Sequence, residues 1–307
     1  MNYAADNRYI FTVFTPTYNR AHTLIGVYES LKNQSFQNFE WLIVDDGSTD
    51  NTKDLVEEWQ RKAKFPIRYI WQKNKGKHIA FNRGVKEAKG ELFLNFDSDN
   101  RCVPQALERF KHHWDSIGNN KREKFSAITA LCVNTEGNLI GDKFPNDIID
   151  SNAFEIRTKY LVFGEKWGFQ RTNILKQFTF PEIADEKFVP EDLIWNRISL
   201  LYQTRFINEE LGIYRELGND SLTKSMTAVR VNSVRATIMY YKEYCQLPVP
   251  IKWKVRQMIN YIRFSLHGRV KLNQIILDSD YSFLTIILFP LGYYFYLSDN
   301  YQFSEST

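Results

Sequence analysis

The stretch FEWLIVDDGSTDNTKDLVEEWQRKA, residues 39–63, starts as a mostly apolar run, turns polar at two aspartates and continues with helical period. In its second part, Leu55, Val56 and Trp59 share one face of a helix. A short buried strand followed by a polar turn and an amphipathic helix is the repeating unit of sheets with parallel strands. The stretch therefore predicts an α/β fold.

The same unit recurs between residue 9 and about residue 134. We expect further elements at these positions: strands at 9–15, 67–72, 91–97 and 125–133, and helices at 21–33, 77–89 and 103–116. This alternation predicts a three-layer fold with a mostly parallel central sheet. Ligands in such sheets bind outside the carboxyl ends of the strands, where this chain places TPTYNR, VDDGSTD, QKNKGKH and FDSDN.

The composition is that of a globular chain, with 307 residues, of which 43% are hydrophobic and 25% charged. The formal net charge is only +4, so the sequence does not indicate nucleic-acid binding. Cys102, Cys132 and Cys245 lie far apart, which argues against a disulfide framework and a structural zinc site. The N-terminus lacks the basic and long apolar regions of a signal peptide, and we expect a cytoplasmic setting.

Two carboxylates, Asp97 and Asp99, follow the predicted strand that ends at FDSDN. Once the chain turns, both can face one point and hold Mg²⁺ or Mn²⁺, whose remaining ligands are water and the phosphate oxygens of a substrate. They could instead cap the helix that begins near Val103. Taken alone, the motif leaves both interpretations open.

Neighbouring strand ends carry further side chains that suit a ligand. One aspartate of the pair Asp45 and Asp46 suffices to cap the next helix, so the other can accept a hydrogen bond from a ligand, such as the imide N–H of uracil. Lys75 and Lys77 flank Gly76, which lets the backbone approach a ligand while the cations face its phosphates. These strand ends favour a phosphorylated nucleotide as the ligand.

The segments FTPTYNRAHTL, FEWLIVDDGSTDNT, NKGKHIAFNRGVKEAKGE and FDSDN resemble, in order and spacing, the nucleotide-sugar domain of the family 2 inverting glycosyltransferases. The resemblance covers roughly the first third of the chain and implies the Rossmann-like GT-A fold and a UDP-sugar donor. It implies these site residues: Pro16, Tyr18 and Asn19 beside the nucleotide, with Tyr18 near the base; Asp46 on uracil; Lys77, Asp97 and Ser98 on the nucleotide sugar; and Asp97 and Asp99 on Mn²⁺ or Mg²⁺. Asn100 stands where close relatives often have an aspartate, which removes a charge but keeps an acceptor oxygen.

The segment FVPEDLIWNRI resembles the family's second acidic motif, which supplies the general base for the acceptor hydroxyl. The base of the family is usually the aspartate of a Glu-Asp pair, which here is Asp192. The offsets to Trp195 and Arg197 point instead to Glu191, which we prefer, with Asp192 as the second choice. At least one of the two acids is expected only to stabilise the first turn of a helix through the helix dipole.

We expect a catalytic domain at residues 1–220, with a nucleotide-sugar half at about 9–134 and an acceptor half at about 135–220. In the acceptor half, Trp167 offers either a face for a sugar ring or a core side chain. A helical region is expected at 221–307.

The helical region combines a basic segment with an apolar one. From Lys252 to Lys271 the chain carries bases and no acid. The apolar run at 281–297 is interrupted by Pro290 and Gly292 and falls short of the ~20 residues that span a bilayer. We expect attachment to an anionic membrane surface, and the alternative is a helix packed on the catalytic core with a solvated basic face.

Together, these features predict a metal-dependent, inverting glycosyltransferase that moves a sugar from a UDP-sugar to a glycan hydroxyl. We expect it to act in the assembly of bacterial surface polysaccharides or glycoconjugates, at the inner face of the cell membrane, where the acceptor can be lipid-linked. Two alternatives stay open. One is a nucleotidyltransferase that forms the sugar nucleotide, although TPTYNRAHT lacks the glycines of a phosphate loop; the other is a noncatalytic carbohydrate-binding protein on a transferase fold.

Overall fold

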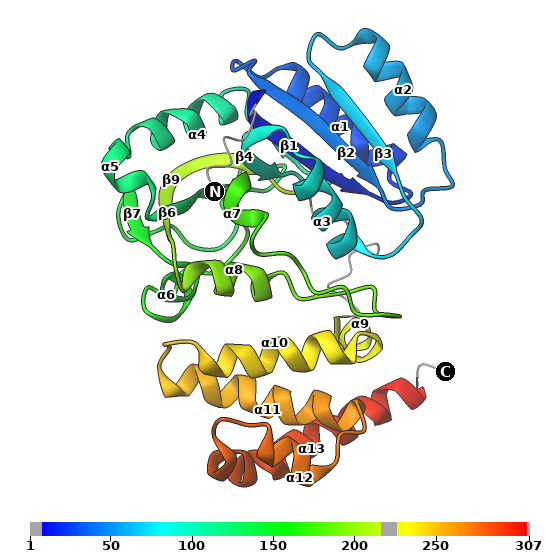
Figure 1. Cartoon of the computed structure of the whole chain (residues 1–307), viewed down its shortest axis with the longest axis vertical. Coiled ribbons are helices and arrows are strands. Elements are labelled where there is room, and N and C mark those ends of the chain that lie inside the picture. The colour runs from blue at the N-terminus through cyan, green and yellow to red at the C-terminus, as the bar shows by residue number, and fades with distance from the viewer. Residues whose placement is uncertain (1–7, 216–225, 306–307) are drawn as a thin grey trace. The chain divides into compact units, whose positions relative to one another are not determined.

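The computed structural model describes residues 8–215 and 226–305, and the chain divides into two compact units (Figure 1). The sheet unit consists of Met1–Thr179 and Leu201–Glu216. The helical unit consists of Phe180–Leu200 and Leu217–Thr307. The chain thus leaves the sheet unit after Thr179 and returns to it at Leu201 for one more stretch of sheet.

The sheet unit is built on one sheet with the strand order β3-β2-β1-β4-β8-β6-β9-β5, in which β7 also pairs with β9. The strands from β3 to β4 in this order are parallel to one another: β1 (Tyr9–Thr17), β2 (Phe39–Asp45), β3 (Ile67–Trp71) and β4 (Gly90–Asn95). Farther along the sheet, β6 (Phe125–Val133) and β9 (Gln203–Ile213) are also parallel to each other.

The other described strands run antiparallel to their neighbours: β5 (Arg101–Cys102), β7 (Ile148–Ser151) and β8 (Lys166–Arg171). The sequence did not predict β8, which lies between β4 and β6. Its centre is Gly168, a residue that is unfavourable in strands. A Cβ atom at Gly168 would lie 2.0 Å from the carbonyl oxygen of Ile128, so the close approach of the two strands requires glycine there.

Helices cover both faces of the parallel strands. On one face, α1 (Ala21–Lys32), α2 (Thr52–Lys62) and α4 (Ala106–Asp115) share an apolar core with the strands. On the other face lies α3 (Lys77–Glu87), whose Phe81 contacts the rings of Phe14 and Phe93. The structure therefore confirms the predicted three-layer α/β fold. Short helices complete the sheet unit: α5 (Asn119–Arg122), α6 (Ala153–Thr158) and α7 (Thr172–Leu175).

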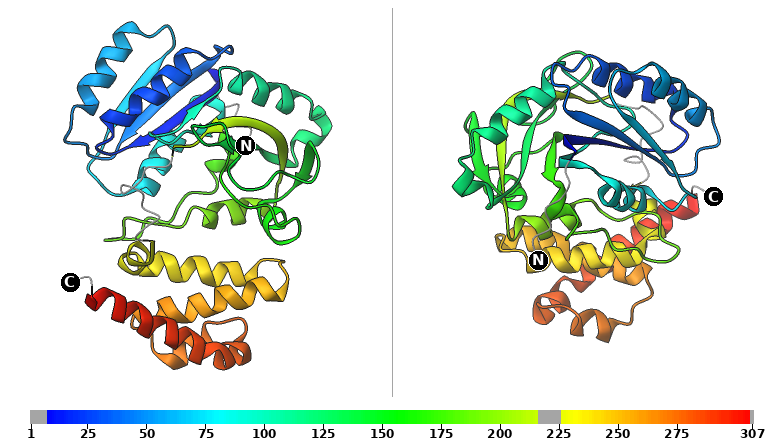
Figure 2. Two further views of the ribbon diagram at one scale, coloured as in Figure 1. Left: turned by 180° about the vertical axis from the view of Figure 1, so that it is seen from behind. Right: turned by 45° about the horizontal axis from the view of Figure 1, so that its top comes forward.

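The described helices of the helical unit are α8 (Asp192–Ser199), α9 (Met226–Asn232), α10 (Val234–Gln246), α11 (Ile251–His267), α12 (Leu272–Leu277) and α13 (Ser282–Glu305). Figure 2 shows α11 packed between α10 and α13. Tyr241 of α10 stacks on Phe264 of α11, and Asp299 of α13 is buried against Arg263 and His267 of α11. The helical character of the C-terminal region is thus confirmed.

The helical unit also contains residues 180–200, which the predicted boundary at residue 220 places with the catalytic domain. The compact units are defined by packing, whereas the predicted domains were defined by function. The division into a catalytic domain at 1–220 and a helical region at 221–307 therefore stays a prediction.

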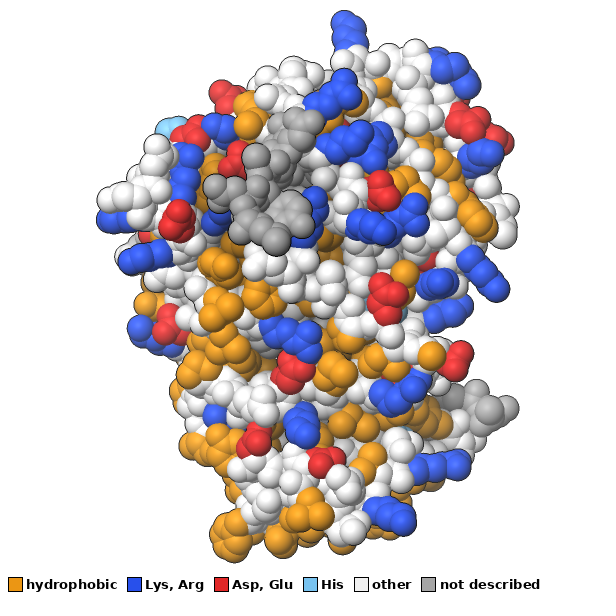
Figure 3. Space-filling model, in the orientation of Figure 1, with side chains coloured by type: hydrophobic (Ala, Val, Ile, Leu, Met, Phe, Trp, Pro, Cys, Tyr) orange, Lys and Arg blue, Asp and Glu red, His pale blue; other side chains and the backbone are white. Residues whose placement is uncertain are grey.

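Helix α13 continues through Pro290 and Gly292, the residues that interrupt the apolar run in the sequence. A Cβ atom at Gly292 would lie 2.5 Å from Ile262 Cγ2, so the glycine permits α13 to pack closely on α11. The exposed apolar side chains of α13 include Phe283, Ile287 and Leu291. Figure 3 shows apolar side chains on the surface of the C-terminal helices. Within residues 8–215 and 226–305, no helix has both the length and the apolarity needed to cross a membrane.

A buried carboxylate in β2 gives a test of the packing of the sheet. Glu40 is fully buried and accepts hydrogen bonds from Thr12 Oγ1 (2.7 Å), the Lys89 N–H (2.8 Å) and Arg68 Nη1 (3.1 Å). We expect Arg68→Met to lower the free energy of unfolding by about 3 kcal/mol, because it leaves the buried charge without its counterion. Chemical denaturation measures the difference.

Arg83→Met is the matched control. Arg83 pairs with Glu87 at 3.3 Å, and the side chains of this pair are 45% and 30% exposed, against 26% and 0% for Arg68 and Glu40. Its loss should cost less than about 1 kcal/mol. The double variant Glu40→Gln/Arg68→Met should recover part of the lost stability. Equal effects of Arg68→Met and Arg83→Met would contradict the explanation by a buried charge.

Candidate functional site

The carboxyl ends of the parallel strands form one edge of the sheet. Thr17 at the end of β1 is paired with Asp45 of β2, and Asp45 is paired with Trp71 of β3. The polar segments that follow β1, β2, β3 and β4 all leave the sheet along this edge. The fold thus gathers the strand ends that the sequence singles out.

Asp46 fastens the loop after β2 to the loop after β3. Its buried carboxylate accepts hydrogen bonds from Gln72 Nε2 (2.8 Å), the Lys75 N–H (3.0 Å) and the Gly76 N–H (2.8 Å). Gly76 has a φ of 102°, which favours glycine, and it directly precedes Lys77, the first residue of α3. Asp46 therefore shapes the loop that presents Lys77, and its contact with uracil stays a prediction.

A reciprocal pair of hydrogen bonds joins the turn after β1 to the turn after β2. The Asn19 N–H donates to Ser48 Oγ (2.8 Å), and Asn19 Oδ1 accepts from the Thr49 N–H (2.8 Å). Pro16 is buried within β1, whereas Tyr18 at the tip of the turn is 49% exposed. Of the three predicted nucleotide contacts at the end of β1 and in the turn after it, Tyr18 offers the most accessible side chain.

Asp45, the neighbour of Asp46, serves the fold. It is fully buried and accepts hydrogen bonds from the Ser48 N–H (2.7 Å) and the Tyr69 hydroxyl (2.5 Å). Burial, and then the Asp45 carboxylate, raise the pKa of Tyr69 well above its usual range. One aspartate of the pair therefore holds its own turn, while the other organises the neighbouring loop.

Charged side chains of both signs gather at the end of β4. Lys77 Nζ lies 2.9 Å from Asp97 Oδ1, and both side chains are partly exposed. Burial, and then the negative charge of Asp97, raise the pKa of Asp99, whereas the positive charges of Arg20 and Lys77 act to lower it. Ser98, between the two aspartates, is buried. Arg20 is a member of this group that the sequence did not single out, although it directly follows Asn19 in the first motif.

The donor set at Asp97 and Asp99 fits a divalent cation that also binds a substrate. The negative charge of Asp97 opposes ionisation of Asp99, and a cation close to both would remove that opposition. Within the part of the chain that the structure describes, no group of three or more His, Cys, Asp and Glu side chains could hold a metal ion. Two carboxylates are a usual protein contribution to Mg²⁺ that is bound together with phosphate.

The residues that follow β9 lie beside the loop that follows β4. The Arg215 N–H donates to Asn100 Oδ1 (3.4 Å). Burial, and then negative charges led by Glu165 and Asp99, raise the pKa of Tyr214. No local pattern marks Tyr214, because the pairing of β5 with β9 brings it to the metal motif from far along the chain.

Trp167 of β8 is a packing residue. Its Nε1–H donates to the backbone oxygen of Asn95 (2.7 Å), and its ring contacts Phe96 and Phe110. Of the two roles that the sequence leaves open for Trp167, the core role is the one that is observed.

The two candidate bases lie in the helical unit, at the start of α8. Glu191 is the N-cap residue and is exposed, and Asp192 is the first helical residue and is partly buried. The buried side chains of Leu193 and Ile194 follow them. Both acids therefore lie at the positive end of the helix dipole, and the role of either as the base stays a prediction.

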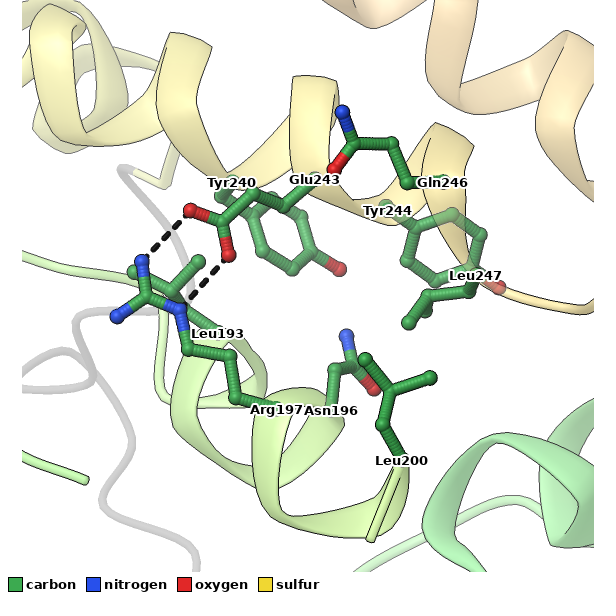
Figure 4. A pocket seen from close by; sticks show the side chains of 9 residues that line it. All are labelled: Leu193, Asn196, Arg197, Leu200, Tyr240, Glu243, Tyr244, Gln246 and Leu247. Atoms are coloured by element: carbon green, nitrogen blue, oxygen red, sulfur yellow. Dashed lines mark hydrogen bonds and ion pairs between the residues drawn. The ribbon is translucent and has the colours of Figure 1, made fainter. Parts of the chain in front are cut away.

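A pocket lies between α8 and α10 within the helical unit (Figure 4). Arg197 Nε and Nη2 donate to Glu243 Oε2 (2.8 Å) and Oε1 (2.6 Å) at one side of it. The sequence did not indicate Glu243, which lies 46 residues beyond its partner. The pocket is lined by Leu193, Asn196, Arg197, Leu200, Tyr240, Glu243, Tyr244, Gln246 and Leu247.

Known sequences match the chain as follows. Residues 12–120 match the model of Glycosyl transferase family 2. An uncharacterized glycosyltransferase of Nostoc sp. is 28% identical over 239 residues, which cover 71% of this chain and 68% of that protein. The GalNAc(5)-diNAcBac-PP-undecaprenol beta-1,3-glucosyltransferase of Campylobacter jejuni is 27% identical over 229 residues, which cover 72% of this chain and 70% of that protein.

Solved structures are similar in fold. S. aureus TarS 1-349 in complex with UDP-GlcNAc has a TM-score of 0.61 at 19% sequence identity, covering 87% of this chain and 79% of that chain. The mannosyltransferase PcManGT from Pyrobaculum calidifontis, in complex with GDP-Man and Mn²⁺, has a TM-score of 0.55 at 14% identity, covering 95% of this chain and 88% of that chain. At these identities the likeness concerns the fold alone.

The family match runs from β1 into α5 and thus includes each strand end at which the polar segments leave the parallel sheet. The named relatives extend the similarity over most of the chain. These matches agree with the resemblance that the motifs of the sequence carry. The chain contains a glycosyltransferase family 2 domain at residues 12–120 and has the GT-A fold.

Proposed function

We propose that this glycosyltransferase moves a sugar from a UDP-sugar to a hydroxyl of a glycan acceptor with inversion. The observation that carries the proposal is the group of Arg20, Lys77, Asp97 and Asp99 at the sheet edge. Cations beside a carboxylate pair suit a diphosphate that binds together with a divalent metal ion. The family 2 match at residues 12–120 and the named relatives favour this activity over that of a nucleotidyltransferase or a noncatalytic binding protein.

Relatives support the donor and acceptor classes. TarS was solved with UDP-GlcNAc, which supports a UDP-sugar. The C. jejuni relative is by name a beta-1,3-glucosyltransferase for GalNAc(5)-diNAcBac-PP-undecaprenol, which supports a lipid-linked glycan acceptor. We therefore place the reaction in the assembly of a bacterial surface polysaccharide or glycoconjugate.

The donor contacts in this proposal come from the strand ends of the sheet unit. Tyr18, exposed at its turn, packs on the uracil ring. Lys77 exchanges its contact with Asp97 for one with a phosphate oxygen. The remaining donor contacts are made by Pro16, Asn19, Asp46, Asp97 and Ser98.

Asp97 and Asp99 would hold the Mn²⁺ or Mg²⁺ ion. When it is bound there, the ion supplies Lewis-acid stabilisation to the negative charge of the leaving diphosphate. Mn²⁺ in the PcManGT complex supports a metal ion in this fold. Arg20 and Lys77 add positive charge from the protein itself.

Glu191, or Asp192 as the second choice, accepts the proton of the acceptor hydroxyl. The hydroxyl oxygen then forms its bond to the anomeric carbon on the face opposite to the diphosphate. The bond from that carbon to the diphosphate oxygen breaks, and the electron pair leaves with UDP. Attack from the opposite face inverts the configuration of the anomeric carbon.

We also propose that the helical unit attaches to an anionic membrane surface at the inner face of the cell membrane. Of the basic residues in this region, Lys254 bonds to the Tyr281 hydroxyl (2.7 Å) and Arg263 pairs with Asp299 (2.6 Å). Exposed bases can contact lipid phosphates, while the exposed apolar side chains of α12 and α13 enter the interface. These exposed bases are Lys252, Arg256, Arg269 and Lys271.

The donor and the metal can be tested together. With UDP-glucose, UDP-GlcNAc and GDP-mannose as a panel, we expect release of UDP from a UDP-sugar, loss of release in excess EDTA, and recovery with Mn²⁺ or Mg²⁺. Asp99→Ala should lower turnover by about 10²-fold or more, because it removes an ion ligand. The pKa of Asp99 is raised, so protons should compete with the metal ion at a higher pH than they would at an ordinary aspartate. As the pH is lowered, the metal affinity should therefore begin to fall at a higher pH than for a site with ordinary aspartates.

Asp54→Ala, at an exposed aspartate of α2, is the control and should leave turnover unchanged. Release of GDP and not UDP would refute the donor assignment. Full turnover in excess EDTA would refute the metal assignment.

The base is tested with Glu191→Gln and Asp192→Asn, which remove charge at nearly constant shape. We expect Glu191→Gln to lower kcat by at least about 10²-fold, because no carboxylate then takes the proton of the glycan hydroxyl. Asp192→Asn should have a smaller effect. UDP affinity, measured by calorimetry, should be unchanged in both. The reverse order would make Asp192 the base, and wild-type kcat in both variants would exclude this segment from the role.

Membrane attachment is tested by flotation with phosphatidylglycerol vesicles at low salt. We expect the triple variant Phe283→Ser/Ile287→Ser/Leu291→Ser to lose most of the flotation of the wild-type chain, because it removes exposed apolar area from α13. Ile25→Ser, at a side chain of α1 that is 49% exposed, is the matched control. Absence of wild-type flotation, or full flotation of the triple variant, would contradict attachment through this face.

A further inference from the structure

The segment that leads into the candidate base is fastened to the start of α10. Glu186 is 7% exposed, and its carboxylate accepts hydrogen bonds from the Arg235 N–H (2.8 Å), Arg235 Nε (3.1 Å) and the Ala236 N–H (2.9 Å). The Phe188 N–H donates to Ser233 Oγ (3.2 Å). A carboxylate on the free N–H groups of a helix start is a charge-assisted contact. Together, these bonds fix residues 186–188, shortly before Pro190.

Helix α8, which follows the candidate base, is fastened to the other end of α10. Arg197 and Glu243 form a two-bond pair at 2.8 Å and 2.6 Å, as Figure 4 shows. Arg197 Nη2 also lies 3.8 Å from Met239 Sδ. Both partners of the ion pair are about one-third exposed, with side-chain values of 33% and 32%. A planar guanidinium bound through two nitrogens fixes orientation as well as distance.

The two attachments lie on either side of Glu191 and Asp192. Along α10 they are separated by about 15 Å, taking 1.5 Å per residue from Ser233 to Glu243. The chain between Phe188 and Arg197 is therefore held at both ends by one rigid helix. The bonds of the first attachment come from Glu186 and Phe188, and those of the second come from Arg197.

We propose that α10 holds the segment with the general base in place, with Arg197 and Glu243 as positioning residues. The inference rests on the proposed function, because it assumes that Glu191 or Asp192 is the base. A base must lie within hydrogen-bond reach of the acceptor hydroxyl, and a displacement of about 1 Å can cost about 10²-fold in rate. The helical unit then takes part in catalysis through the placement of a proton acceptor.

The test compares Glu243→Gln, Arg197→Lys and the reversed pair Arg197→Glu/Glu243→Arg with the wild-type chain. The readout is release of UDP from the UDP-sugar that the wild-type chain turns over, together with UDP affinity by calorimetry. We expect Glu243→Gln to lower kcat about 10- to 10²-fold with UDP affinity and donor KM unchanged. Arg197→Lys should retain more activity than Glu243→Gln because it keeps the charge, and the reversed pair should recover at least part of the loss.

Asp150→Asn is the matched control. Asp150 forms a two-bond pair with Arg205 (2.8 Å and 2.9 Å) between strands of the sheet unit. Its loss should lower the melting temperature without changing kcat. Hydrogen exchange gives a second readout that does not need turnover: Glu243→Gln should speed exchange in residues 188–199, and Asp150→Asn should not.

Two results would overturn the proposal that α10 positions the base. One is wild-type kcat and wild-type exchange in Glu243→Gln. The other is a fall in UDP affinity that matches the fall in turnover, because a misplaced base leaves donor binding intact. Failure of the proposed function is distinguishable, since Glu191→Gln and Asp192→Asn would then both keep wild-type kcat.

Discussion

The carboxylate of Asp46 is the constraint on which the sheet-edge site depends. The loop from Gln72 to Gly76 follows a strand and precedes a helix, and two of its N–H groups bond to this carboxylate. Backbone N–H groups outside helices and strands need other partners, and a charged acceptor provides a strong one. The loops approach so closely that a Cβ atom at Gly47 would lie 2.8 Å from the Asn74 nitrogen. The start of α3, and with it Lys77, is fixed relative to β2 in this way.

The sequence predicted the parallel half of the sheet well because each of its units is local. Strand, turn and helix follow one another within residues 39–63, and the pattern alone gives their order and the edge at which Asp46 lies. The antiparallel strand β8 was missed because its pairing with β4 and β6 is set by distant residues and centres on Gly168. Tyr214 and Glu243 were missed for the same reason, since long-range contacts, and no neighbouring motif, bring them to their partners.

Charge explains why the carboxylates of the FDSDN motif suit a site better than a cap. Placing Asp97 near the partly buried Asp99 disfavours ionisation of the second carboxyl, which is a cost to the folded protein. Lys77 offsets that cost from the start of α3, on a loop that Asp46 holds. Two carboxylates with a lysine partner form a set in which cations and phosphate oxygens can replace the internal ion pair. A capping role would need only one of the two acids.

The helical unit contains both the candidate bases and the proposed membrane surface, which the sequence placed in separate regions. Helix α11 packs on both α10 and α13, so it links the helix that carries the exposed apolar side chains to the helix that holds α8. Removing the chain from residue 249 onward would uncover the Tyr241 side of α10, which α11 now buries. In the proposed mechanism, the C-terminal helices are therefore not separable from the segment that carries the candidate base. If Glu191 or Asp192 is the base, the packing of α11 on α10 reaches the proton transfer through Arg197 and Glu243.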